Sequence, residues 1–133
     1  MKRNDIATRA DIALQVESFY AKVRKHELLG PIFNDVIKDW PSHLVKLTDF
    51  WETNLLFVRN YKGNPLKAHV LVETKHNHTI EQLHFGHWLQ LWFETLDENF
   101  EGKNCELAKE RARHMAHIMF LRIFNERERR NEA

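Results

Sequence analysis

Cysteine is nearly absent from this 133-residue chain, in which Cys105 is the only one. A single cysteine excludes an intrachain disulfide and favours a reducing compartment. In a helical stretch it is expected to be a small, partly buried side chain rather than a catalytic thiol. Apolar runs long enough to span a bilayer are also lacking, and the polar residues 1–10 have no apolar core of a secretory signal. These absences predict a cytoplasmic location and no membrane partner.

An excess of charge of one sign is lacking too. The chain has 20 Lys and Arg against 19 Asp and Glu, which gives a formal net charge of +1. A nearly neutral molecule has no strong field to attract nucleic acid, so no nucleic-acid partner is expected. The length fits one domain over residues 1–133, with frayed tails over residues 1–8 and 126–133.

Glycine and proline are scarce, at four and three residues, and strand-like alternation is weak. The pattern therefore predicts an all-α fold of four substantial helices and two short ones. Helix starts are expected at Thr8, at Asp39 with Pro41 in the first turn, at Asn64 with Pro65, and in a capping box over residues 79–82. Stops are expected at Leu29-Gly30-Pro31 and at residues 101–104. In the last expected helix, one set of residues recurs at helical spacing and is expected to share a face: Leu107, Arg111, Met115, Ile118, Met119, Arg122 and Ile123.

Aromatic residues and histidines are abundant. The chain contains four Trp, nine Phe and nine His, and a large aromatic cofactor would account for part of each excess. His69 is expected on a short helix, and three longer helices each offer bulky or polar aromatics toward it. This constellation is suited to holding a flat iron cofactor.

The order of these motifs resembles the truncated haemoglobins, and within them the third group. The resemblance runs from about Ile12 to about Phe124, and it rests on the segments Phe19-Tyr20, Leu29 to Phe33, His43 with Phe50-Trp51, Pro65 to His69, and Phe85 to Leu89. The chain lacks the paired-glycine motifs of the other groups, as the third group does. The resemblance implies a two-over-two helical sandwich around a haem. It also implies that the cofactor is haem b and that the protein binds dioxygen.

His69 is the predicted proximal ligand of the iron, because a globin haem needs one neutral imidazole on that side. Taken alone, His69 would more often be a surface histidine on an amphipathic helix, and the aromatic residues in register with it favour the ligand instead. The propionates of the haem are expected near the loop between the distal and proximal helices, where cations or a hydroxyl would pair with them. The alternative is that the charged residues of this loop are simply solvated. The candidates there are Arg59, Tyr61 and Lys62, and Lys67 is another candidate.

Three side chains are predicted to face a ligand on the distal side, namely Tyr20, His43 and Trp88. A phenol or an indole N–H can donate to the partly negative outer atom of bound dioxygen. The alternatives are a tyrosine with its tip at solvent, a tryptophan in the core, and a partly exposed histidine at a helix start. His43 could also gate the pocket or bind iron itself. Further haem packing is expected from Phe33, Leu47, Phe50 and Trp51, although Trp51 could serve the helix core instead.

The predicted function is binding of dioxygen and other diatomic ligands. Each hydrogen bond to a charged acceptor contributes roughly 1.5–3 kcal/mol, so two would slow oxygen loss by roughly two to four decades. Such slow release favours redox chemistry on nitric oxide or peroxide, although no catalytic residue is assigned. No flavin or nicotinamide motif is present, so electrons would come from a separate reductase. The alternative is a haem-free all-helical interaction module. Histidine pairs elsewhere, such as His84-x-x-His87 and His114-x-x-His117, are expected to be surface or partly buried residues.

Overall fold

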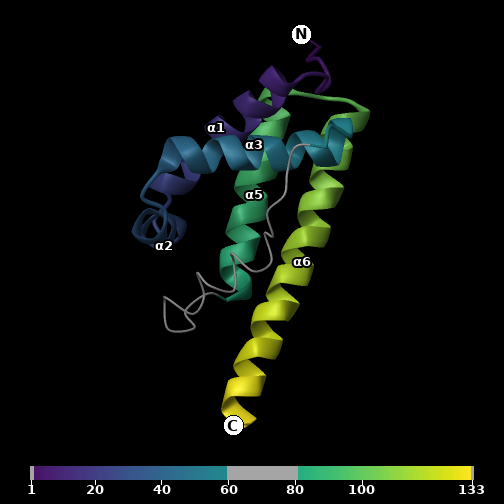
Figure 1. The fold of residues 1–133 in the computed structure, drawn as a ribbon. Helices are drawn as coiled ribbons and strands as arrows, with labels where there is room; N and C mark the ends of the chain where they lie inside the picture. Colours follow the sequence, from purple (N-terminus) through teal and green to yellow (C-terminus); the bar gives the residue numbers. More distant parts are fainter. Residues whose placement is uncertain (1, 60–80, 133) are drawn as a thin grey trace.

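The computed structural model describes residues 2–59 and 81–132, apart from the side chains of residues 126, 127 and 130–132. Within these ranges the chain is helical, without strands (Figure 1). The helices are α1 (Arg9–Lys25), α2 (Leu29–Val36), α3 (Trp40–Leu56), α5 (Gln82–Asn99) and α6 (Lys103–Glu132). Over the described residues, no helix combines the length and the apolar character that a membrane span needs.

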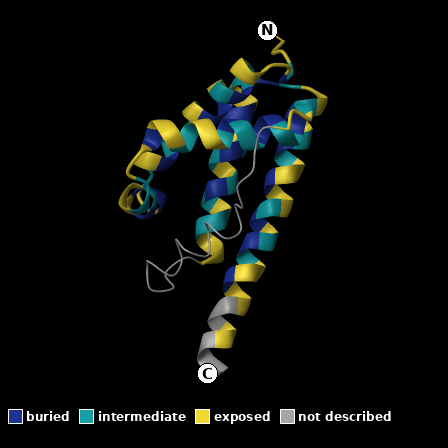
Figure 2. Cartoon of the chain, in the orientation of Figure 1, coloured by how far each residue is buried: buried dark blue, intermediate teal, exposed yellow. Residues whose placement is uncertain are grey.

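The helices form two pairs. Helix α1 contacts α2, α3 and α5, and α5 contacts α6, which runs beside it and extends past its end (Figure 1). The buried residues in Figure 2 gather where the α1–α3 pair meets the α5–α6 pair. This arrangement confirms the all-α, two-over-two sandwich that the resemblance implies. The short helix expected around His69 lies outside the described residues.

Alanines form the buried surface of α6. Ala108, Ala112 and Ala116 are 0%, 0% and 3% exposed, at the four-residue spacing of one helix face. This face packs against α5, where the carbonyl oxygen of Ala108 accepts from Trp92 Nε1, whereas Arg111 and Arg122 are exposed. The phase predicted for this helix is therefore wrong at those two arginines, although Met119 and Ile123 are buried as expected.

Two helix starts match their predicted caps. Thr8 Oγ1 accepts a hydrogen bond from Asp11 N at 3.2 Å, and Asp11 Oδ2 accepts one from Thr8 N at 3.1 Å. Asp39 Oδ1 accepts from Ser42 N at 3.2 Å, with Pro41 in the first turn of α3. In each case a side-chain oxygen satisfies a backbone N–H that the helix leaves unpaired, so local sequence is enough to locate the start.

The predicted stop at Leu29-Gly30-Pro31 is wrong. Helix α1 ends at Lys25, and these three residues form the first turn of α2. Proline is tolerated there because its missing N–H would have no partner in a first turn. Gly30 is required by close packing rather than by a helix end, since a Cβ atom on it would lie 2.6 Å from the carbonyl oxygen of Arg24.

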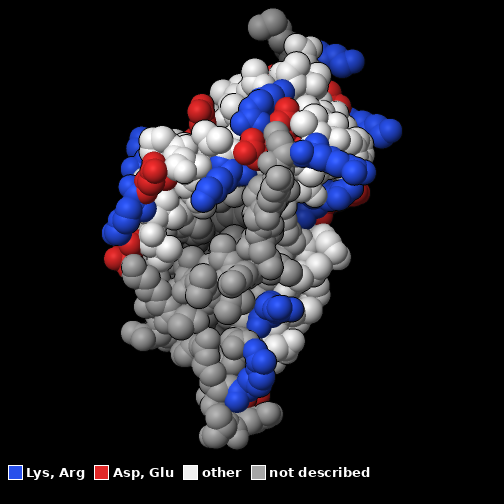
Figure 3. Space-filling view, in the orientation of Figure 1, with Lys and Arg blue, Asp and Glu red and all other residues white. Residues whose placement is uncertain are grey.

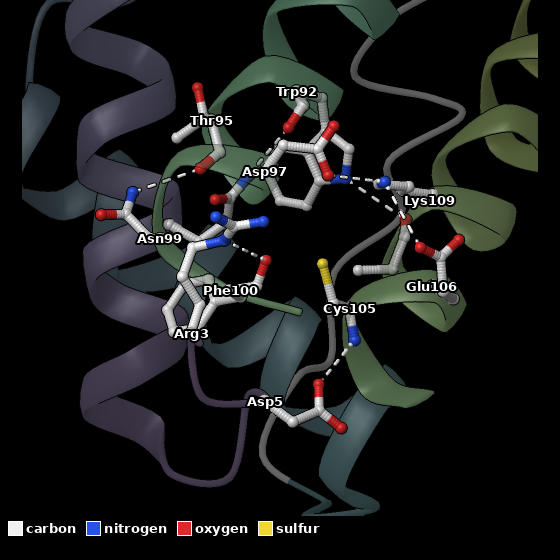
Figure 4. Close-up of polar contacts among 12 residues, drawn as sticks. Arg3, Asp5, Trp92, Thr95, Asp97, Asn99, Phe100, Cys105, Glu106 and Lys109 are labelled. Carbon is white, nitrogen blue, oxygen red and sulfur yellow. Dashed lines mark hydrogen bonds and ion pairs between the residues drawn. The ribbon is translucent and has the colours of Figure 1, made fainter. Parts of the chain in front are cut away.

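Residues 5 and 6, within the segment predicted as a frayed tail, dock against the start of α6. Asp5 Oδ2 and Oδ1 accept hydrogen bonds from Asn104 N and Cys105 N, both at 2.8 Å, and Figure 4 shows the second of these. Ile6 is 1% exposed and joins the core. At the other end, where a second frayed tail was expected from residue 126, helix α6 continues to Glu132.

Cys105 is more buried than predicted, at 1% exposed. Burial raises the pKa of its thiol, so the thiol stays protonated at neutral pH. A buried, protonated thiol is a poor nucleophile, which agrees with a packing role.

Replacing Asp5 by alanine is expected to destabilise the fold by about 1–2 kcal/mol, because two N–H groups in the first turn of α6 lose a charged acceptor. The free energy of unfolding can be measured by urea denaturation. The matched control is Glu110→Ala, which removes an exposed carboxylate from the same helix. Equal unfolding midpoints for the two variants would contradict the capping role of Asp5.

Candidate distal ligand site

Tyr20 is the centre of an aromatic cluster built from three helices. Its side chain is only 5% exposed, so the alternative of a solvent-facing phenol is wrong. Its ring packs edge-on or tilted against Phe33 of α2 at 6.1 Å between centroids, and against Trp40 and His43 of α3 at 5.7 and 5.8 Å. The phenol is thus held in one orientation by rings on several sides.

Burial determines the protonation state of Tyr20. Removal from water raises the pKa of its hydroxyl far above the ordinary value, and the nearby Trp88 indole lowers it only in part. The hydroxyl therefore keeps its proton at every physiological pH. It remains a neutral hydrogen-bond donor inside the cluster.

Trp88 brings a second donor to the same cluster from α5. Phe19 lies between the two, with its ring centroid 4.7 Å from that of Tyr20 and 5.5 Å from that of Trp88. Trp88 Nε1 is buried and has no hydrogen-bond acceptor among the described residues. The indole is close enough to Tyr20 to affect the pKa of the phenol, yet the two groups do not meet hydrogen-bond geometry.

A comparison with Trp92 shows that the unpaired state of Trp88 is unusual. Trp92 lies one helical turn further along α5, and its Nε1 donates to the carbonyl oxygen of Ala108 at 3.2 Å (Figure 4). Both indoles are buried in the same core. A buried N–H without an acceptor is destabilising, so its persistence at Trp88 points to an acceptor that is not part of the described chain.

His43 is the third distal candidate, and the structure brings it to the other two. Its ring is half-buried and makes edge contacts with Tyr20 and with Trp40, the latter at 5.6 Å between centroids. It lies in the first turn of α3, whose N-cap is Asp39. The structure therefore brings residues from α3 and α5 close to Tyr20 of α1, and their role toward a ligand stays a prediction.

The predicted haem-packing residues have different surroundings. Phe33, Leu47 and Phe50 are half-buried at the edge of the core. Trp51 is 3% exposed and stacks on Trp92 at 4.6 Å between centroids and 24° between planes, so its main role is in the helix core. Arg59 is exposed beyond the end of α3. His69, Tyr61, Lys62 and Lys67 lie outside the described residues.

An open, mainly apolar pocket of about 260 Å³ lies between α3 and α6. Phe50 and Trp51 line it from α3, and Met115 and Ile118 line it from α6. The α6 residues were placed on an apolar face by the sequence pattern but were not assigned to a site, because nothing local shows that α6 passes α3. The pocket is completed by Asn54, Arg111 and His114.

The remaining histidines within residues 2–59 and 81–132 do not gather into a metal site. In the described part of the chain, no group of three or more His, Cys, Asp or Glu residues is placed to hold an ion. His84 and His87 are half-buried, and His114 and His117 are exposed, as predicted. On the face shown in Figure 3, acidic and basic side chains are interspersed over α1 and α3, in keeping with the small net charge.

Comparison with known proteins identifies the family. No family model matches the sequence. The chain is 39% identical over 104 residues to the group 3 truncated hemoglobin ctb of Campylobacter jejuni, which covers 74% of this chain and 78% of that protein. Its structure is similar to the crystal structure of the group III truncated hemoglobin from Campylobacter jejuni, with a TM-score of 0.81, 33% identity, and coverage of 92% of this chain and 95% of the other. The chain therefore belongs to the group III truncated haemoglobins.

Proposed function

We propose that this globin uses haem b to bind dioxygen and related diatomic ligands in a polar distal pocket formed by Tyr20, His43 and Trp88. The observation that carries the proposal is the buried N–H of Trp88, which has no acceptor among the described residues and lies beside the buried phenol of Tyr20. Two such donors in one apolar cluster are suited to a ligand whose outer atom is partly negative. The residues present thus fit a haem-bound diatomic ligand.

Haem, when bound, would supply an iron that is held by one histidine and binds small ligands. His69 is the proposed histidine. The single cysteine, Cys105, is not part of a Cys-x-x-Cys-His segment, so covalent attachment of the c type does not apply and haem b is the proposed form. Phe33, Leu47 and Phe50 offer apolar contacts, and Arg59, Tyr61 and Lys67 are the proposed partners of the propionates.

The chain's own residues then determine how the ligand is held. The phenol of Tyr20 donates a hydrogen bond to the ligand, because burial keeps its hydroxyl protonated. The rings of Phe19, Phe33 and Trp40 fix the orientation of the phenol. The indole of Trp88 donates from α5. Because these rings also exclude water, each hydrogen bond is stronger than it would be in a solvated pocket. Slow release of dioxygen favours redox chemistry on nitric oxide or peroxide, with electrons from a separate reductase.

Replacing Trp88 by phenylalanine tests this proposal. The variant keeps a buried ring but loses the N–H, and dioxygen dissociation is expected to become roughly tenfold faster, since a donor to a charged acceptor contributes at least about 1.5 kcal/mol. Dissociation can be followed by stopped-flow displacement with carbon monoxide.

Trp92→Phe is the matched control, because it removes an indole N–H of the same helix that is already paired with Ala108. It is expected to lower the free energy of unfolding while leaving dioxygen dissociation close to that of the unaltered protein. If the Trp88 variant released dioxygen no faster than the Trp92 variant, Trp88 would not contact the ligand.

A further inference from the structure

The side of the α5–α6 pair that faces away from α3 carries a groove of about 310 Å³, lined by residues within 82–89 of α5 and 113–120 of α6. We call it the outer groove. On α6 its lining residues lie about half a turn around the helix from those that line the pocket between α3 and α6. The outer groove shares no residue with that pocket, and none of its residues is assigned to the haem or to the distal cluster. Because α5 and α6 alone line it, the outer groove is a separate feature of the fold.

Gly86 lies inside α5 and lines the outer groove, and no packing contact among the described residues explains a glycine at this position. A Cβ atom on Gly86 would meet nothing within 4 Å, whereas one on Gly30 would lie 2.6 Å from the carbonyl oxygen of Arg24. Glycine inside a helix is destabilising relative to alanine, because glycine loses more conformational freedom on folding. The missing side chain at Gly86 therefore lowers helix stability and leaves the groove open, which points to a molecule that lies against α5 there.

The walls of the outer groove are apolar. Phe85 and Leu89 line it from α5, and Ala116 and Phe120 line it from α6. The rings of Phe85 and Phe120 meet edge to face near the start of α5, with 6.1 Å between centroids and 79° between planes. Phe85, Leu89 and Phe120 are half-buried, so they leave apolar surface that an occupant can cover. Covering this surface with an apolar chain is favourable.

A cation lies at the other end of the outer groove. Arg113 is seven residues before Phe120, which is about 10 Å along α6. Its guanidinium lies 5.1 Å from the ring centroid of Phe93, and it forms no ion pair with the described residues. Lys109, one turn earlier, differs because its ammonium pairs with two carboxylates, at 2.7 and 3.4 Å. The charge of Arg113 is therefore available to a carboxylate, which a guanidinium can hold with two parallel N–H···O bonds.

We propose that the outer groove binds a free fatty acid. The carboxylate lies on Arg113, and the acyl chain runs over Gly86 to the rings of Phe85 and Phe120. His117, which is exposed one turn after Arg113, offers a further ring N–H to the carboxylate. A chain without a charge would leave the guanidinium unpaired, and a charge without a chain would leave the apolar walls uncovered. A groove between two helices takes a single chain, so the ligand is a monomeric fatty acid rather than a lipid bilayer.

Calorimetric titration of the freshly purified protein with decanoate tests the proposal. Saturable binding of one decanoate per chain is expected. Arg113→Gln is expected to weaken decanoate binding by about tenfold or more, because the charged donor is lost, and to leave unchanged the binding of decan-1-ol, which has the same chain without the charge. The matched control is Arg111→Gln, which removes an exposed cation of the same helix that lines the pocket between α3 and α6. It is expected to bind decanoate as the unaltered chain does.

Gly86→Leu fills the outer groove with a side chain. Because leucine is a better helix former than glycine, this variant is expected to unfold at a higher urea concentration than the unaltered chain while losing decanoate binding. Full binding in Gly86→Leu or in Arg113→Gln, no binding in the unaltered chain, or a loss confined to Arg111→Gln would each overturn the proposal. The Soret band recorded during each titration reports the haem separately. A colourless chain that binds decanoate in the expected pattern would overturn the proposed function and leave this inference standing.

Discussion

Dioxygen is expected to leave the Tyr20→Phe variant about 10 to 100 times faster than it leaves the unaltered protein. The variant keeps the ring that packs against Phe33, Trp40 and His43 but removes the hydroxyl. A hydrogen bond to a charged acceptor contributes roughly 1.5–3 kcal/mol, which corresponds to about one to two decades in rate. Stopped-flow displacement of dioxygen measures the effect directly.

Two controls belong with the Tyr20 variant. Thr95→Val also removes a buried hydroxyl, one that donates to Leu91 O at 2.7 Å two helical turns from Trp88 on α5, and it is expected to leave dioxygen release unchanged. Carbon monoxide carries little charge, so its dissociation is expected to change much less than that of dioxygen. Equal changes for both ligands would show that Tyr20 acts through pocket shape rather than through a hydrogen bond.

The double variant Tyr20→Phe with Trp88→Phe shows whether the two donors act on one ligand. Residues that share a partner give non-additive effects, whereas independent residues add within about 0.5 kcal/mol. Non-additive dissociation rates are expected here, because Phe19 contacts both rings and the two donors lie in one cluster. Strict additivity would place the two donors at separate sites.

His69→Gly is expected to abolish stable haem binding, since the proposed iron ligand is removed. The deletion also leaves a space of imidazole shape, so free imidazole added at high concentration is expected to restore a haem spectrum. Haem content after gel filtration, with and without imidazole, measures both effects. His76→Gly makes the same change seven residues further along the chain and is expected to retain haem. Full haem content in the His69 variant would exclude His69 as the ligand.

Local sequence was sufficient for features determined by neighbouring residues. Thr8 and Asp39 were identified as caps because a side-chain oxygen bonds an N–H only two or three positions away. The same local reasoning misread Gly30-Pro31, since glycine and proline suit both the end of one helix and the first turn of the next. The close approach of Gly30 to Arg24, which selects the second role, depends on how α1 and α2 pack.

Features that depend on distant residues could not be predicted. The docking of Asp5 on the first turn of α6 joins residues about one hundred positions apart, and no periodicity reports it. The alanine face of α6 was also missed, because alanine is a weak hydrophobic signal beside leucine and methionine. Only the structure shows that this face packs against α5, where the carbonyl oxygen of Ala108 accepts from Trp92 Nε1.

The distal residues could be predicted only through the family resemblance, and their pairing could not be predicted. The family resemblance predicted Tyr20, His43 and Trp88 as distal residues, and the described structure places His43 and Trp88 each close to Tyr20. Sequence could not show which of the buried indoles is unpaired, since that depends on the position of the Ala108 carbonyl across the α5–α6 contact. It also left open whether Trp51 packs in the core, which its stack on Trp92 resolves.

Haem binding is tested by the absorption spectrum of the freshly purified protein during titration with haemin, followed by dithionite and carbon monoxide. We expect a strong Soret band that saturates at one haem per chain and shifts when carbon monoxide is added to the reduced protein. That result would establish a haem whose distal face, beside Tyr20 and Trp88, accepts a diatomic ligand. A protein that stays colourless and takes up no added haemin would contradict the account and favour a haem-free helical interaction module.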